Sequence, residues 1–213
     1  MNIFPKWTNH LPTIALILVI VLSTLAVGIV WYWFSPKNTD VGYAPLQPVP
    51  YSHKLHVGEL GMDCRYCHAN VERSPAATIP PTQVCMNCHK IIKADSPNIL
   101  KLRESFDNNR PMAWKKVHNL PDYAYFDHSR HVLAGISCVS CHGRIDKMAI
   151  VHQVQPLSMR WCLDCHRAPE YHLRPLAQIT QLDWKAEDQL SLGLQIKKEK
   201  NIHPREACSV CHR

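Results

Sequence analysis

The most hydrophobic part of the chain is an uncharged run near its amino terminus. Residues 11–34 read LPTIALILVIVLSTLAVGIVWYWF and contain no Asp, Glu, Lys or Arg. As an α-helix they would extend about 36 Å, enough to cross the roughly 30 Å hydrocarbon core of a bilayer with some tilt. Trp7 precedes the run and Trp31, Tyr32 and Trp33 lie at its end, where amphipathic rings suit the membrane interfaces. The pattern predicts one membrane-spanning helix.

Two other structures are compatible with an apolar run. A cleaved signal peptide has a shorter apolar region and a small-residue cleavage site, whereas Ala26-Val27-Gly28 is a poor site and bulky aromatics follow it. A buried helix of a soluble protein normally has a polar face, which this run lacks. We therefore expect residues 1–34 to form a retained membrane anchor.

The remainder of the chain has little periodic patterning. Residues 35–50, SPKNTDVGYAPLQPVP, contain four prolines and predict an extended linker that holds the following domain away from the membrane. Ser96-Pro97 followed by NILKLRESF predicts a short capped helix. Residues 183–199 predict a second helix, weakened by Gly193. We expect little or no strand, so the fold class is mainly α and irregular.

Composition draws attention to two residue types. The 213 residues include 10 Cys and 14 His, but only 7 Gly against 16 Pro. Scarce glycine disfavours a large doubly wound α/β domain, whose tight turns use it. The formal charge of +7 could suggest a nucleic-acid partner, but the cysteines change that interpretation.

Every cysteine belongs to one of five C-x-x-C-H motifs, the attachment signature of c-type haem. They are Cys64-Arg-Tyr-Cys67-His68 (motif 1), Cys85-Met-Asn-Cys88-His89 (motif 2), Cys138-Val-Ser-Cys141-His142 (motif 3), Cys162-Leu-Asp-Cys165-His166 (motif 4) and Cys208-Ser-Val-Cys211-His212 (motif 5). The two thiols bond to the vinyl groups of one porphyrin, and the histidine is the proximal iron ligand. Zinc ribbons and disulfides need no histidine after the second cysteine. We therefore predict five covalent haem c groups.

Five haems alter the expected core and the expected charge. Residues 51–213 supply about 33 residues per haem, too few to enclose each in its own hydrophobic core. We expect a loop-rich multihaem cytochrome c domain in which the haems form the core. Their propionates add about −10, which brings the assembled protein near −3. A nucleic-acid partner is therefore not expected.

An internal repeat precedes two of the motifs. Tyr51-Ser-His53-Lys-Leu-His56 precedes motif 1, and Phe126-Asp-His128-Ser-Arg-His131 precedes motif 3. In each copy an aromatic residue and an HxxH pair are followed by two motifs. This predicts two di-haem modules, residues 51–90 and 126–167, with a fifth haem at residues 208–212.

The repeat also supplies candidate distal iron ligands. Histidines three apart lie about one helical turn apart, so one can ligate its own module's haem while the other reaches a neighbouring haem. A further candidate lies in a short apolar context between the modules. The predicted distal ligands are His53, His56, His128, His131 and His118. The sequence leaves open whether His152, His172, His203 or Met159 is an iron ligand, and which distal histidine serves which haem.

Two long stretches resemble a known family. They are QPVPYSHKLHVGELGMDCRYCHANVERSPAATIPPTQVCMNCHK and VHNLPDYAYFDHSRHVLAGISCVSCHGRIDKMAIVHQVQPLSMRWCLDCHRAPE. They resemble the pentahaem cytochrome c subunit of bacterial alternative complex III, over about residues 44–213 plus the anchor. The modules are also similar to the wider class III multihaem cytochromes.

The resemblance implies a place in a membrane complex that oxidises quinol and delivers electrons to a cytochrome c or an oxidase. It implies as partners an iron–sulfur subunit, polytopic quinol-binding subunits and a monohaem cytochrome c. Because haem c is attached on the outer face of the cytoplasmic membrane, we expect a single-pass protein of the bacterial inner membrane with a periplasmic carboxy-terminal domain.

Three functions are compatible with these features. The first is a non-catalytic electron-transfer subunit with five haems. The second is a single-anchor multihaem quinol dehydrogenase, which the 29 residues between Phe34 and Cys64 disfavour, because such enzymes hold a haem at the membrane. The third is a pentahaem reductase of nitrite or a similar substrate, which needs an open iron position and often a lysine variant of the motif; all five motifs here end in histidine.

Overall fold

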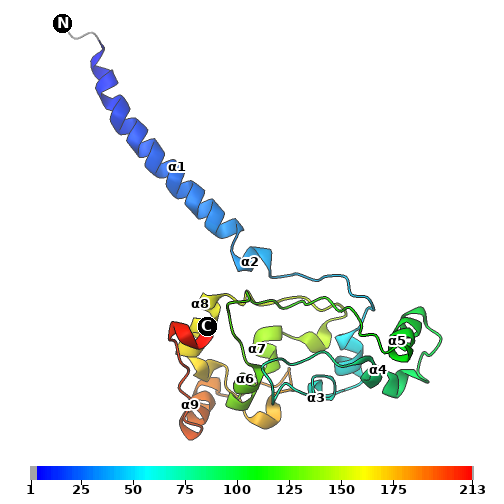
Figure 1. The fold of residues 1–213 in the computed structure, drawn as a ribbon. Helices are drawn as coiled ribbons and strands as arrows, with labels where there is room; N and C mark the ends of the chain where they lie inside the picture. The colour runs from blue at the N-terminus through cyan, green and yellow to red at the C-terminus, as the bar shows by residue number, and fades with distance from the viewer. Residues whose placement is uncertain (1–3, 213) are drawn as a thin grey trace. The chain divides into compact units, whose positions relative to one another are not determined.

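The computed structural model describes residues 4–212 and divides the chain into two compact units, Met1–Asp40 and Val41–Arg213. The first unit is dominated by helix α1, Leu11–Trp33, preceded by the 3₁₀-helix Lys6–His10 (Figure 1). The segment Lys6–Trp33 has a mean hydropathy of 2.8, and none of its most apolar window is buried. The predicted amino-terminal apolar helix is therefore confirmed, and its length and composition fit a membrane anchor.

A short helix closes the first unit. Helix α2, Pro36–Thr39, begins after Ser35, whose backbone is extended. Proline at the first helical position is favoured because its fixed φ suits the helix and its missing N–H is not needed there. The segment predicted as an extended linker therefore contains one helical turn.

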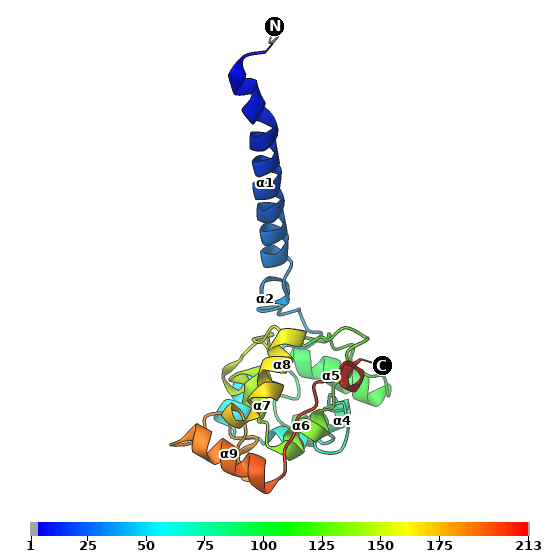
Figure 2. The same cartoon turned by 90° about the vertical axis from the view of Figure 1, so that its left-hand side faces the viewer.

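The second unit consists of short helices joined by irregular segments, as Figure 2 shows. Its helices are η2 (Lys54–Glu59), α3 (Cys64–Cys67), α4 (Thr82–His89), α5 (Pro97–Asp107), α6 (His128–Ala134), α7 (Cys138–His142), η3 (Ile145–Lys147), α8 (Met159–Arg167), η4 (Pro169–Tyr171), η5 (Leu176–Gln178), α9 (Gln189–Glu199) and α10 (Cys208–Cys211). Within residues 4–212 the β-structure is limited to an isolated bridge between Ile136 and Leu173. The predicted class, mainly α and irregular, is confirmed.

Side-chain caps fix where the two predicted helices begin. Ser96 accepts a hydrogen bond from the Ile99 backbone N–H at the start of α5, which confirms the helix predicted there. The other helix was predicted from residue 183 but begins only at Gln189. The Asp188 side chain accepts a hydrogen bond from the Ser191 N–H. This cap satisfies an N–H of the first turn that has no partner within the helix, so the helix begins directly after Asp188.

The irregular segment that opens the second unit is hydrogen-bonded to later parts of that unit. The Gly42 N–H donates to the Gln153 carbonyl at 2.7 Å, and the Gln153 N–H donates to the Tyr43 carbonyl at 3.1 Å. The Gln47 side chain exchanges two hydrogen bonds of 2.9 Å with the Lys115 backbone. Residues 41–47 are therefore held on the body, although their backbone is not helical.

Gly193 allows α9 to pack closely on η4. A Cβ at this position would lie 1.9 Å from the Glu170 carbonyl oxygen, far inside van der Waals contact. We expect Gly193→Ala to lower the free energy of unfolding by about 2 kcal/mol or more, because the helix must move away from η4. Thermal unfolding of the haem-loaded protein measures this loss.

The matched control for this substitution is Lys198→Ala, on the exposed side of the same helix. It should leave the melting temperature almost unchanged. Equal melting temperatures for the Gly193 and Lys198 variants would show that the contact between α9 and η4 does not require glycine.

Candidate functional site

Each of the five motifs occupies a helical turn. Helices α3, α7 and α10 begin at the first cysteine of motifs 1, 3 and 5, while motifs 2 and 4 form the ends of α4 and α8. One helical turn places residues i and i+3 on the same face. Both cysteines of a motif are therefore presented on one side, with the histidine directly after them.

Four of the motif histidines are oriented by a backbone carbonyl. In each, Nδ1 lies at hydrogen-bonding distance from a carbonyl oxygen, which leaves Nε2 available as a ligand. The pairs are His68 with Thr78 at 2.6 Å, His89 with Ile92 at 2.9 Å, His166 with Arg205 at 2.9 Å and His212 with Tyr123 at 3.0 Å. This is the outer contact that metal-binding histidines usually make, because it fixes the tautomer and the ring orientation.

Three histidines of the HxxH pairs have the same orientation. Their Nδ1 atoms lie 2.7 to 2.9 Å from backbone carbonyl oxygens: His56 from Ser52, His128 from Pro75 and His131 from Asp127. Nδ1 of His53 is buried without a hydrogen-bond partner. These three distal candidates therefore present Nε2 in the same manner as the motif histidines.

Three pairs of rings have the spacing of two ligands on opposite sides of one metal ion. With metal–nitrogen bonds of about 2.0 Å and a ring centre about 1.1 Å beyond each nitrogen, two such rings lie roughly 6.2 Å apart. The observed centroid distances are 6.2 Å for His56 and His89, 6.4 Å for His128 and His142, and 6.1 Å for His131 and His166. Each pair joins an HxxH histidine to a motif histidine.

The aromatic residue of each repeat has the same contacts in both copies. Tyr51 stacks on the second HxxH histidine at 4.4 Å and meets the first edge-on at 4.8 Å. Phe126 likewise stacks on His131 at 4.4 Å and meets His128 edge-on at 4.8 Å. The sequence repeat is therefore a structural repeat. By this equivalence we expect His53 to pair with His68, and the two are close enough to interact electrostatically.

Burial keeps several of these imidazoles neutral. It lowers the pKa of His53 to about 4 and that of His142 to about 3, and nearby histidines add to both effects. Burial also lowers the pKa of His131. A histidine must be neutral to give its lone pair to a metal, so these side chains are ready to bind iron at neutral pH.

His118 has a different neighbour from the other predicted ligands. Its Nε2 lies 3.3 Å from Nδ1 of His142, and the two rings meet edge-on with centroids 4.3 Å apart. That distance is too short for rings on opposite sides of one iron. His118 thus takes the place that a backbone carbonyl has beside the other motif histidines. Its role as an axial ligand stays a prediction.

The four further residues that the sequence leaves open as iron ligands lie outside the ring pairs. Nδ1 of His152 lies 3.4 Å from the Ile150 carbonyl, and Nε2 of His203 lies 2.9 Å from the Asn201 side chain. Burial lowers the pKa of His172, and Met159 is exposed at the start of α8. None of the ring pairs described above includes them.

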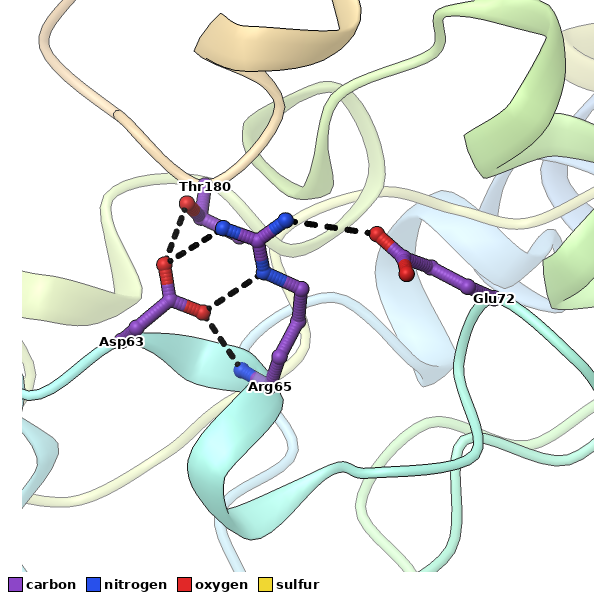
Figure 3. A network of polar contacts seen from close by, with 4 residues as sticks. All are labelled: Asp63, Arg65, Glu72 and Thr180. Atoms are coloured by element: carbon purple, nitrogen blue, oxygen red, sulfur yellow. Dashed lines mark hydrogen bonds and ion pairs between the residues drawn. The ribbon is translucent and has the colours of Figure 1, made fainter.

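A polar network anchors the helix of motif 1 (Figure 3). Asp63 accepts from the Arg65 backbone N–H at 2.8 Å and caps α3, while the Arg65 guanidinium binds both Asp63 and Glu72. These bonds to Arg65 hold the pKa of Asp63 at about 2. Thr180, far along the chain, donates to Asp63 at 2.8 Å. Sequence reasoning missed Thr180, because no local pattern marks a contact this distant.

The described residues suit haem c in three respects. Each motif presents two thiols and a histidine on one turn, the histidines are oriented through Nδ1, and three ring pairs have the spacing of axial ligands. Within residues 4–212 no group of three or more His, Cys, Asp or Glu side chains is arranged to hold a metal ion by itself. The haem-attachment prediction thus agrees with the donor geometry.

A comparison with known proteins points the same way. Over 175 residues the chain is 27% identical to the "Menaquinone reductase, multiheme cytochrome c subunit" of Nitratidesulfovibrio vulgaris strain Hildenborough, with 78% of this chain and 77% of the relative covered. This similarity supports a multihaem cytochrome c of electron transport with covalently bound haem. No protein-family model matches the chain.

Replacing His118 tests its role. If it accepts a hydrogen bond from His142, His118→Ala should leave the number of low-spin haems unchanged. It should raise the midpoint potential of one haem by roughly 40 mV, the equivalent of a hydrogen bond worth about 1 kcal/mol. The rise is expected because the ligand loses an acceptor and donates less electron density. Redox titration with EPR spectroscopy measures both quantities.

The control is His118→Gln, whose carbonyl oxygen can still accept the hydrogen bond and should keep the potential near its original value. A new high-spin haem signal in both variants would instead establish His118 as an axial ligand.

Proposed function

We propose that this chain is an electron-transfer subunit that carries electrons through five covalently bound c-type haems, within a membrane quinol-oxidising respiratory complex that delivers them to a cytochrome c or an oxidase. The observation that carries the proposal is the set of three ring pairs at 6.1 to 6.4 Å, each joining a motif histidine to an HxxH histidine. With haem bound, such a pair would supply two histidine ligands to the iron and would leave no position for a substrate.

The residue roles follow from this pairing. The ten motif cysteines attach the porphyrins and the five motif histidines are the proximal ligands. We assign the distal ligands of motifs 1, 2, 3 and 4 to His53, His56, His128 and His131, in that order. The fifth distal ligand predicted from the sequence, His118, is the one that the substitution above tests.

The haems, when bound, supply one-electron redox chemistry. The chain's own residues attach, orient and enclose them. Because the paired histidines would both ligate the iron of a bound haem, the subunit itself is proposed not to be an enzyme. A pentahaem reductase would need an open position and is less well supported.

The domain organisation is part of the same proposal. Residues 1–34 anchor the protein, residues 35–50 link the anchor to the body, and residues 51–213 form the pentahaem domain with its two di-haem modules, 51–90 and 126–167. We place the body on the periplasmic side of the bacterial inner membrane. This placement rests on where haem c is attached.

The partners that we propose are those of alternative complex III: an iron–sulfur subunit, polytopic quinol-binding subunits and a monohaem cytochrome c. The quoted sequence stretches support this assignment. The similarity to a menaquinone reductase subunit supports the coarser partnership, a membrane complex that handles quinones.

That relative also favours a second candidate, in which electrons flow toward the quinone. Oxidising a quinol releases two electrons and two protons, and reducing a quinone consumes the same number. The present chain would carry only the electrons, one at a time, in either direction. The redox potentials of the partners decide the direction, not the ligand geometry of this subunit.

Gentle purification from detergent-solubilised membranes tests the proposal. We expect five covalent haems per chain, co-purifying polytopic and iron–sulfur subunits, and quinol-dependent reduction of a cytochrome c. Menaquinone reduction by the complex, without quinol oxidation, would support the second candidate. A lone protein that quinol reduces directly would instead identify a single-anchor quinol dehydrogenase, and nitrite turnover would identify a reductase.

A further inference from the structure

Motifs 1 and 3 lie against each other although they are far apart in the sequence. The thiols of Cys64 and Cys138, the first cysteines of the two motifs, are close enough to interact. One loop also holds the residues that precede both motif helices. Thr180 donates to Asp63 at 2.8 Å, and Ser137 donates to the Ile179 carbonyl at 2.6 Å. Two independent contacts therefore join these motifs.

Motif 2 lies on the other side of motif 1. The Asn87 amide of motif 2 donates to the Tyr66 hydroxyl of motif 1 at 3.0 Å. The thiols of Cys85 and Cys67 are near enough to interact electrostatically, and Tyr51 is close to the cysteines of both motifs. No comparable contact between motifs 2 and 3 is found within residues 4–212.

Motif 4 joins motif 3 to motif 5. The ring of His131, just before motif 3, lies 6.1 Å from that of His166 in motif 4, and the Cys141 thiol is near both cysteines of motif 4. Cys162 of motif 4 is in turn near Cys211 of motif 5. The two residues Arg205 and Glu206, just before motif 5, contact the histidine of motif 4 and the arginine that follows it. Nδ1 of His166 lies 2.9 Å from the Arg205 carbonyl, and Arg167 forms a 2.9 Å ion pair with Glu206.

Exposure distinguishes the two ends of this series from its middle. Of the ten cysteines, Cys88 and Cys208 are exposed and the other eight are half-buried. The two exposed cysteines belong to motifs 2 and 5. In the view of Figure 1, α4, α3, α7 and α8 are drawn in this order across the second unit.

We propose that the five attachment motifs form one unbranched row in the order 2, 1, 3, 4, 5, so that motifs 2 and 5 are the ends at which redox partners exchange electrons with the chain. The inference deepens the proposed function and rests on it. Two di-haem modules thus meet through their first motifs, and sequence order is reversed within the first module. An electron that enters at one end passes every attachment site before it leaves at the other.

His53 and His56 provide a matched pair of substitutions for testing the order. They lie on the same turn, but we assign them to motifs 1 and 2. Replacing either by alanine opens one axial position and should create one high-spin ferric haem. A high-spin haem speeds the magnetic relaxation of its immediate neighbours. EPR relaxation measurements on the oxidised full-length protein in detergent therefore count those neighbours.

In the proposed row His53→Ala should perturb two low-spin signals and His56→Ala should perturb one. A row in sequence order predicts the reverse, one for His53→Ala and two for His56→Ala, and that result would overturn the proposal. If either variant fails to accumulate, the order of irons in a crystal structure of the haem-loaded full chain decides the same question. An unsubstituted chain without covalent haem would overturn the proposed function as well, whereas five haems with reversed counts would overturn the order alone.

Discussion

Replacing Cys138 and Cys141 by alanine is expected to remove the middle haem, interrupt electron flow between the two ends and destabilise the body. Motif 3 lies beside motifs 1 and 4, and His142 is half-buried, with a pKa that burial lowers to about 3. Because cofactor binding contributes directly to folding, the free energy of unfolding should fall by about 3 kcal/mol or more. Haem content, thermal unfolding and quinol-dependent cytochrome reduction measure the three effects.

The matched control removes the haem at one end, by replacing Cys208 and Cys211. Cys208 is exposed and α10 lies at the carboxy terminus. This variant should lose one haem but retain most of its stability, with the remaining four still in series. Equal losses of stability in the two double variants would contradict a row in which motif 3 is central.

Placing an arginine in the middle of α1 is expected to release the protein from the membrane. Val21 lies near the centre of this helix and its side chain is exposed. A charged residue at the centre of a spanning helix costs about 3 kcal/mol, or roughly a hundredfold in the inserted fraction. Carbonate extraction of membranes should therefore recover Val21→Arg mainly in the soluble fraction, with its haems attached if export still takes place.

Leu11→Arg is the control for this substitution. Leu11 is the first residue of α1, where a long basic side chain can reach the headgroup region, so membrane retention should be nearly normal. Release of both variants to the same extent would show that the position within the bilayer does not matter and would argue against a spanning helix.

Local features of the sequence were predictable and long-range neighbours were not. The apolar helix follows from an uncharged run, the start of α5 from Ser96-Pro97, and the paired geometry of the HxxH residues from a repeat that is visible in the sequence. The later start of α9 depends on the cap that Asp188 provides, which the apolar pattern does not reveal. These elements are decided within a few residues.

The candidate site shows the same division. Spacing identifies the motif histidines, since the ligand directly follows its cysteines. It cannot reveal that Thr180 binds Asp63 or that His118 lies beside His142, because these contacts depend on how irregular segments fold back. For the same reason the spatial order of the motifs could not be read from their order in the chain.

The relative orientation of the paired imidazole rings has a spectroscopic consequence. The planes of His128 and His142 differ by 8°, those of His131 and His166 by 40°, and those of His56 and His89 by 62°. Parallel ligand planes give different energies to the two iron d orbitals that overlap with the imidazole π systems. Crossed planes make the energies of these two orbitals nearly equal. The haem at motif 3 should therefore give a rhombic ferric spectrum, and the haem at motif 2 a strongly anisotropic one. Chemically identical cofactors would thus carry distinct spectral labels along the row.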